Sequence, residues 1–291
     1  MHNDLSLKIW GRAEFDTEEA ARRILKYLLD AGDYKPEYFG EIPPLKAPFE
    51  EKTLQKAIDL LIGKVRREMF PDQVFGRIYL ERKKIPKVEY YKLEWRQLTN
   101  IPFFPVSSYR IESEYIKDSK RLHSWLEFCI PPLSFHDAWY ASFCLDEQWR
   151  RDHQFDVRSK PSSARPEGFI AKITRGTDLA KGIPGVYWGT YFGPFYVEWL
   201  GREKFERLDC YQIKELETGG ILLLLTERPD TWMHNDHQAL RRSIIEALGQ
   251  DAFYDADTIR KEFDALPYVD DYYNFDPASF QKPRRVPKFP F

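Results

Sequence analysis

The chain has few cysteines and no long apolar run. Its three cysteines, Cys129, Cys144 and Cys210, are an odd number with no CxxC spacing. This pattern predicts neither a disulfide framework nor a zinc site, so we expect buried thiols in a reducing compartment. The longest purely aliphatic run, Ile221 to Leu225, is too short to span a bilayer, and the polar start MHND does not resemble a signal peptide. We therefore expect a cytoplasmic protein with no membrane partner.

Neither sign of charge is in large excess. The 291 residues carry 44 Lys and Arg against 46 Asp and Glu, a formal net charge of −2. Domains that bind nucleic acid are usually basic, so no nucleic-acid partner is expected. A hydrophobic fraction of 43% with 16% aromatic residues excludes general disorder. The length indicates one extended domain or two interlocked halves.

Phosphate-binding glycine motifs are also missing. The glycines at 182, 185, 189 and 193 fit neither GxGxxG nor GxxxxGK[ST], and no cationic side chain follows them. We expect these glycines to allow tight turns and close packing of the neighbouring aromatic residues. Those aromatic residues, from Tyr187 to Tyr196, are expected in the core rather than in a ligand groove, because aromatic side chains dominate cores.

Metal-binding patterns are weak. His234 and His237 stand three residues apart at the start of an expected helix, where two imidazoles could face one cation. Zinc needs three or four ligands, and no third ligand is indicated. The simpler interpretation is a capped helix with solvent-facing histidines, so neither a metal nor a cofactor is predicted.

Catalytic patterns are weak as well. Cys129 or Cys144 could pair with a distant histidine, but neither has a sequence context that would lower the pKa of its thiol. His136 and Asp137 are adjacent, and in a strand they would point to opposite faces. No catalytic residue is therefore predicted.

The first half of the chain reads as helices followed by strands. A strand is expected at 5–10, helices at 17–31 and 50–69, strands at 74–83, 88–97, 109–116 and 138–145, and a helix at 119–127. Asp16 followed by Glu19 resembles a capping box. In 88–97, alternating residues share one face, which indicates a sheet with one wet side.

Glycine and proline delimit the elements of the second half. Gly193-Pro194 opens a short helix, 194–200, that Gly201 ends. Strands at 210–216 and 221–226 flank Gly219-Gly220, and Asn235 is expected to cap a helix, 235–248, that stops at Gly249. The predicted fold class is α+β, a largely antiparallel or mixed sheet of six to eight strands flanked by helices.

The segment 156–168, DVRSKPSSARPEG, reads as a connecting loop because it has two prolines, three serines and no aromatic residue. It divides the chain into an N-terminal α+β half, 1–155, and a C-terminal α+β half, 169–291. An exposed excursion within one continuous domain would have the same composition.

One surface pattern stands out between Gln250 and Asp276. This segment contains eight acidic residues and only two basic residues, and seven aromatic residues are interleaved with them. Carboxylates beside tyrosines suit capture of a basic protein partner, although rings that pack inward beneath solvated acids would give the same pattern. The expected partner-binding residues are Asp251, Asp255, Asp257, Asp270, Asp271, Tyr272 and Tyr273.

Three stretches in 182–260 resemble the C-terminal part of the bacterial immunity-protein 52 group. They are VYWGTYFGPFYVEWLGREKFERL, the hairpin GGILLLLTERPDTW, and LRRSIIEALGQDAFY. The opening KIWGRAEFDTEEAARRIL is compatible with the strand and helix that begin such proteins. The resemblance implies a cytoplasmic α+β protein that binds and neutralises a cognate toxin, and it brings no catalytic residues.

The resulting hypothesis is a non-catalytic protein that occludes a basic surface of a toxin. One alternative is a hydrolase whose site lies in the central region around His123, His136 and Cys144. Another is a scaffold subunit of a bacterial assembly, which self-association would reveal. The sequence does not predict the oligomeric state.

Overall fold

The computed structural model describes residues 4–11, 15–64, 75–96, 106–158, 170–174, 179, 182–254 and 285. The strands are β1 (Leu5–Gly11), β2 (Tyr38–Gly40), β3 (Ala47–Pro48), β4 (Phe75–Arg82), β5 (Val88–Arg96), β6 (Val106–Ile111), β7 (Ala138–Leu145), β8 (Gln154–Arg158), β9 (Ile170–Thr174), β10 (Gly189–Phe192), β11 (Gln212–Glu215) and β12 (Ile221–Leu224). The helices are α1 (Glu18–Leu29), α2 (Leu54–Leu61), α4 (Ser119–Phe135), α5 (Asp146–His153), α6 (Pro194–Leu200), α7 (Arg202–Phe205) and α8 (Asn235–Leu248).

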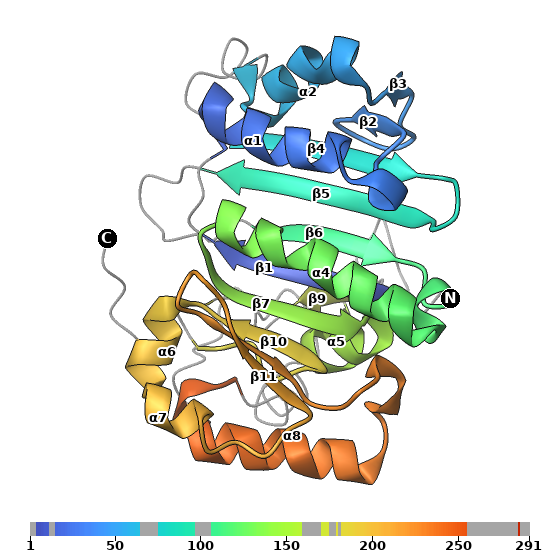
Figure 1. Ribbon diagram of the computed structural model, residues 1–291. Coiled ribbons are helices and arrows are strands. Elements are labelled where there is room, and N and C mark those ends of the chain that lie inside the picture. The colour runs from blue at the N-terminus through green and yellow to red at the C-terminus, as the bar shows by residue number, and fades with distance from the viewer. Residues whose placement is uncertain are drawn as a thin grey trace.

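Ten strands form one antiparallel sheet in the order β11-β12-β10-β7-β1-β6-β5-β4-β2-β3 (Figure 1). The predicted α+β fold class is confirmed, but the predicted number of strands, six to eight, was too low. The short strands β2, β3 and β10 were not recognised because two to four residues are too few to show an alternating pattern. Strands β8 and β9 form a separate two-stranded sheet.

Both faces of the sheet are covered by hydrophobic packing. Helices α1, α2 and α4 lie across one face (Figure 1), and the core beneath them includes Leu5, Leu7 and Ile9 of β1. A second core on the opposite face includes Trp10 and Tyr140, with residues of α6 and α8. Successive side chains of a strand point to opposite faces of its sheet, so those of β1 alternate between the two cores.

The sheet runs through both halves of the chain. Strand β7 pairs with β1 on one side and with β10 on the other, so residues before 155 and after 169 share one hydrogen-bonded sheet. Strand β8 extends to Arg158, so the first three residues of the expected loop are strand. Residues 159–168 lie outside the described residues.

The ends of several predicted elements differ from the structure. Helix α1 begins after Thr17, whose Oγ1 accepts a hydrogen bond from the amide of Ala20, so the cap is Thr17 and not Asp16. His234, not Asn235, occupies the N-cap position of α8. Strand β6 spans 106–111 instead of 109–116, because residues 115–117 form a 3-10 turn. Strands β11 and β12 are shorter than expected, whereas α6 has its predicted bounds.

Helix α2 is shorter than the predicted 50–69. It ends at Leu61, and Gly63 follows with φ of 69°, a left-handed conformation typical of a residue that terminates a helix. The apolar spacing of Leu54, Ile58 and Leu61 continues to Val65 in the sequence, which made the helix look longer. Residues 65–69 lie outside the described residues.

Helix α4 is longer than the predicted 119–127 because it continues through Pro131 and Pro132. Proline has no amide hydrogen, so Pro132 leaves the carbonyl of Phe128, four residues before it, without its usual helical donor. The hydroxyl of Tyr27 in α1 donates to that carbonyl at 2.6 Å, and its ring stacks on Phe128. A contact from a distant helix therefore replaces the missing backbone bond.

The glycines before α6 act as predicted. Gly182 and Gly185 have φ of 148° and 153°, which L side chains rarely adopt. A Cβ on Gly193 would collide with the carbonyl oxygen of Ala138. This close approach brings the N-terminus of α6 against β7, where the Gly193 amide donates to the Trp139 carbonyl at 2.8 Å.

Replacing Tyr27 by Phe should destabilise the protein by about 1–3 kcal/mol, because the partly buried Phe128 carbonyl loses its donor. Denaturant unfolding measures the change. Tyr211→Phe is the matched control, because the Tyr211 ring is 58% exposed, and we expect it to stay within about 0.5 kcal/mol of the parent. Equal stability of both variants would contradict the role of the Tyr27 hydroxyl.

Candidate functional site

The predicted acidic and aromatic surface is described only at its beginning. Asp251 is exposed, with its carboxylate 3.9 Å from Nε of Arg285, and its carbonyl accepts the Arg285 amide at 3.1 Å. The other predicted contact residues lie outside the described residues. They are Asp255, Asp257, Asp270, Asp271, Tyr272 and Tyr273. Their place in a binding surface stays a prediction.

The first two aromatic residues of this segment pack towards the protein. Phe253 is buried and packs edge-on against Phe192 at 6.4 Å between ring centroids. Tyr254 is half-buried, and its amide donates to the carbonyl of Ile183 at 2.9 Å. The segment therefore leaves α8 with the Phe253 ring inward and Asp251 outward.

The aromatic residues before and within α6 belong to the core, as predicted. Tyr187, Trp188 and Phe192 are buried, and so are Tyr191 and Tyr196. They divide between the two hydrophobic cores on either side of the sheet. Their side chains pack the strand and the helix together.

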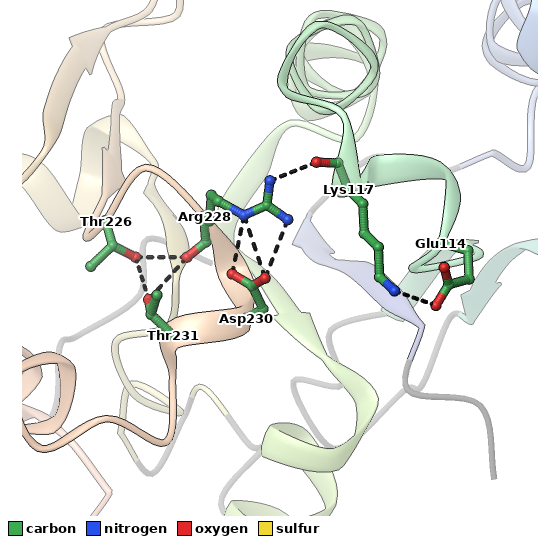
Figure 2. Close-up of polar contacts among 6 residues, drawn as sticks. All are labelled: Glu114, Lys117, Thr226, Arg228, Asp230 and Thr231. Carbon is green, nitrogen blue, oxygen red and sulfur yellow. Dashed lines mark hydrogen bonds and ion pairs between the residues drawn. The ribbon is translucent and has the colours of Figure 1, made fainter.

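The Thr-Glu-x-Pro step after β12 ties the C-terminal half to the N-terminal half (Figure 2). The hydroxyls of Thr226 and Thr231 both donate to the carbonyl of Arg228, at 2.8 and 3.1 Å. The Arg228 guanidinium donates to the carbonyl of Lys117 at 2.6 Å and pairs with Asp230 at 3.2 Å. This part of the motif acts as a structural clasp across 111 residues of sequence.

His234 and His237 do not face a common cation. His234 is exposed, whereas His237 is buried with Nδ1 at 3.5 and 3.4 Å from the hydroxyls of Thr226 and Thr231. Burial and the nearby Arg241 lower the pKa of His237 to about 4. The expectation that both histidines face solvent was wrong for His237. Within the described ranges, no group of three or more His, Cys, Asp or Glu side chains could hold a metal ion.

The residues of the hydrolase alternative are far from one another in the fold. His136 lies at the end of α4 in the first core, where Nδ1 bonds the Pro132 carbonyl at 2.7 Å and burial lowers its pKa to about 4. Cys144 lies in the second core on the opposite face of the sheet. His123 is exposed on α4. These three side chains do not assemble a catalytic site.

The three thiols differ in exposure. Cys129 and Cys144 are buried as predicted, and burial raises the pKa of Cys144 to about 12 and that of Cys129 well above its usual range. Cys210 is only half-buried, contrary to the prediction, because it precedes the exposed edge strand β11. Its thiol donates to the carbonyl of Gln212 at 3.6 Å.

A buried polar network between α5 and α8 was not recognised in the sequence. Arg241 of α8 pairs with Asp152 of α5 at 2.7 Å and lies 5.2 Å above the ring of Tyr187. The Tyr187 hydroxyl also bonds Nε2 of His153. Burial lowers the pKa of Arg241, but Asp152 and Tyr187 raise it by more, so the guanidinium stays charged. The network holds α8 against the rest of the protein, and no spacing in the sequence marks these partners.

Comparison with known proteins gives a likeness of fold. No family model matches the chain, and no curated protein matches it. Among solved structures, the T6SS protein PA0821 of Pseudomonas aeruginosa superposes with a TM-score of 0.54 at 10% sequence identity, over 84% of this chain and 72% of that one. At this identity the likeness shows a shared fold. None of the described helices has the length and apolar character needed to cross a membrane.

Arg228→Met should destabilise the protein by about 1–1.5 kcal/mol, because it removes the solvent-exposed hydrogen bond from the guanidinium to the Lys117 carbonyl that joins the two halves of the chain. Asp230→Asn should cost less than about 1 kcal/mol, because the pair is exposed to solvent. Denaturant unfolding of both variants measures the difference. A larger loss in the Asp230 variant would contradict the clasp as described.

Stability should fall as the pH is lowered from about 6.5 towards 4. The unfolded chain takes up protons on His136 and His237 in this range, whereas the folded state, with both pKa values at about 4, does not. By pH 5 each histidine should cost about 2 kcal/mol. Denaturant unfolding at pH 7 and pH 5 measures the loss.

In His136→Leu, the loss of stability between pH 7 and pH 5 should be smaller by the contribution of one histidine, even if the substitution also changes the stability at pH 7. His123→Gln, at an exposed position of the same helix, is the matched control. An unchanged slope in the His136 variant would show that its imidazole is not held neutral in the fold.

Proposed function

We propose that this protein is a non-catalytic, cytoplasmic immunity protein that binds a cognate bacterial toxin and occludes it. The observation that carries the proposal is the fold shared with a T6SS protein over 84% of the chain. The resemblance of residues 182–260 to the immunity-protein 52 group supports the same assignment from the sequence.

The state of the candidate nucleophiles supports a binding role. The thiolate is the reactive form of cysteine, and burial raises the pKa of all three thiols. His136 is enclosed in a core, with one ring nitrogen bonded to a backbone carbonyl. These groups stabilise the fold instead of meeting a substrate.

The acidic segment that begins at Asp251 is the proposed contact surface. Asp251 presents its carboxylate to solvent directly after α8, while Phe253 anchors the segment in the second core. A chain fixed in this way can present carboxylates and tyrosines to a basic surface of the toxin. Complementary charge speeds encounter, and aromatic anchors supply buried contact area.

The first test of the function is capture of the partner from the source cells with the tagged full-length chain, followed by co-expression. Tight one-to-one binding to a toxin domain, together with rescue of growth, is the expected result. A captured toxin that remains lethal when both proteins are expressed would overturn the proposal. Self-association without a captured partner would favour a scaffold subunit instead.

Reversing the charge of Asp270 and Asp271 to Lys should slow association with the toxin and invert its salt dependence, because screening would then weaken a repulsion. Stopped-flow association at low and high salt measures both effects. The control is Glu19→Lys with Asp33→Lys, two exposed sites that change the net charge equally. Equal rates for the two double variants would place the contact surface elsewhere.

A further inference from the structure

A row of polar side chains crosses the middle of the sheet on the face opposite α1, α2 and α4. Lys8 of β1 stands directly opposite Ser108 of β6 and Ser142 of β7. Beyond them, Lys92 of β5 faces Ser108, and Thr190 of β10 faces Ser142. Directly opposed residues in an antiparallel sheet have Cβ atoms about 4.5–5.5 Å apart. The Cβ atoms of two lysines and three hydroxyl-bearing residues therefore lie side by side across five strands.

The cations near Lys8 already have carboxylate partners. The Lys92 ammonium lies 2.5 Å from the carboxylate of Glu94. The Arg110 guanidinium pairs with Glu89 at 2.5 Å, with Asp4 at 3.5 Å, and with Asp146. Their charges are compensated within the fold.

Lys8 differs from these cations. In the part of the chain that the structure describes, no carboxylate lies within ion-pair distance of its ammonium, which rests 4.7 Å from the centre of the Trp149 ring. An aromatic face attracts a cation but does not neutralise it. Burial lowers the pKa of Lys8, and the positive Arg110, Lys92 and Arg150 lower it further.

The hydroxyl beside Lys8 also lacks a strong partner. Ser142 is fully buried, and among the described residues no nitrogen or oxygen atom bonds its Oγ. The Cys144 thiol close to it is only a weak hydrogen-bonding group. Burial of an ammonium and a hydroxyl that have only weak partners is unfavourable, and an anionic ligand that accepts hydrogen bonds from both offsets this cost.

We propose that Lys8, Ser108 and Ser142 form a binding site for a carboxylate group. Lys8 supplies the charge, and the two serine hydroxyls can donate to the carboxylate oxygens. A single negative charge fits better than a phosphate dianion, because Lys92 and Arg110 already have carboxylate partners among the described residues and the acids Glu94 and Asp146 are nearby. Lys8 is half-buried, so part of this residue keeps its contact with solvent. The proposal does not depend on the immunity function.

The test uses the full-length chain with its lysines reductively methylated with ¹³C, so that each lysine gives an NMR signal. Absence of its signal in Lys8→Met identifies Lys8. Titration with acetate should shift the Lys8 signal saturably. At ten times the dissociation constant, the apparent pKa of Lys8 should rise by about one unit, because acetate binds the protonated form. Exposed Lys56 on α2 is the internal control and should not shift saturably.

Further ligands distinguish the source of the carboxylate. A saturable shift with acetate indicates a small free carboxylate, whereas a shift only with a capped tripeptide carrying one glutamate indicates an acidic side chain of a protein. A shift with phosphate alone overturns the carboxylate assignment, and no shift with any of them overturns the site. An equal shift at Lys56 shows an adventitious ion only.

A second experiment measures Tm in unmethylated protein. Acetate should raise Tm in the parent and in Lys8→Arg but not in Lys8→Met. Equal increases in Tm in all three proteins would overturn the role of the Lys8 charge.

Discussion

Strand β1 lies between β6 and β7, and both of its edges are hydrogen-bonded. Leu5, Leu7 and Ile9 enter the core beneath α1, α2 and α4, whereas Trp10 enters the core on the other face. A shift in register by one residue would exchange these two sets of side chains. The register of this one strand therefore fixes how the two halves of the chain pack.

The beginning of β1 is held by charge as well as by hydrogen bonds. Arg110 bridges Asp4 before β1 and Asp146 at the start of α5, and the Ser6 hydroxyl donates to Asp146 at 2.6 Å. A buried ion pair contributes little net stability unless further hydrogen bonds satisfy its atoms, and the Ser6 hydroxyl supplies such a bond. This cluster fixes α5 against β1 and β6, next to the polar row that contains Lys8.

The sequence predicts an element well when its limits are set locally. Helix α6 has its predicted bounds because Gly193-Pro194 and Gly201 act within the segment itself. Helix α4 was predicted too short because the donor to the Phe128 carbonyl, which Pro132 leaves unpaired, comes from Tyr27, 101 residues before Phe128. His237 and Arg241 were not recognised as buried because their partners Thr226 and Asp152 are set by tertiary packing. In the predicted contact surface, composition alone identified the acidic segment, and Asp251 is its one predicted contact residue that the structure describes.

The central place of β1 also governs the order in which the chain can fold during synthesis. Ser6 and its partner Asp146 are 140 residues apart, so β1 leaves the ribosome long before β6 and β7 exist to pair with it. Until then, the backbone groups on both edges of β1 have no native partners, and Leu5, Leu7 and Ile9 lack their core neighbours from β6, β7 and α4. Native contacts this distant in sequence slow folding, and an unpaired apolar strand favours association with other chains. Both edges of β1 are therefore open to pairing with other chains until β6 and β7 have been made.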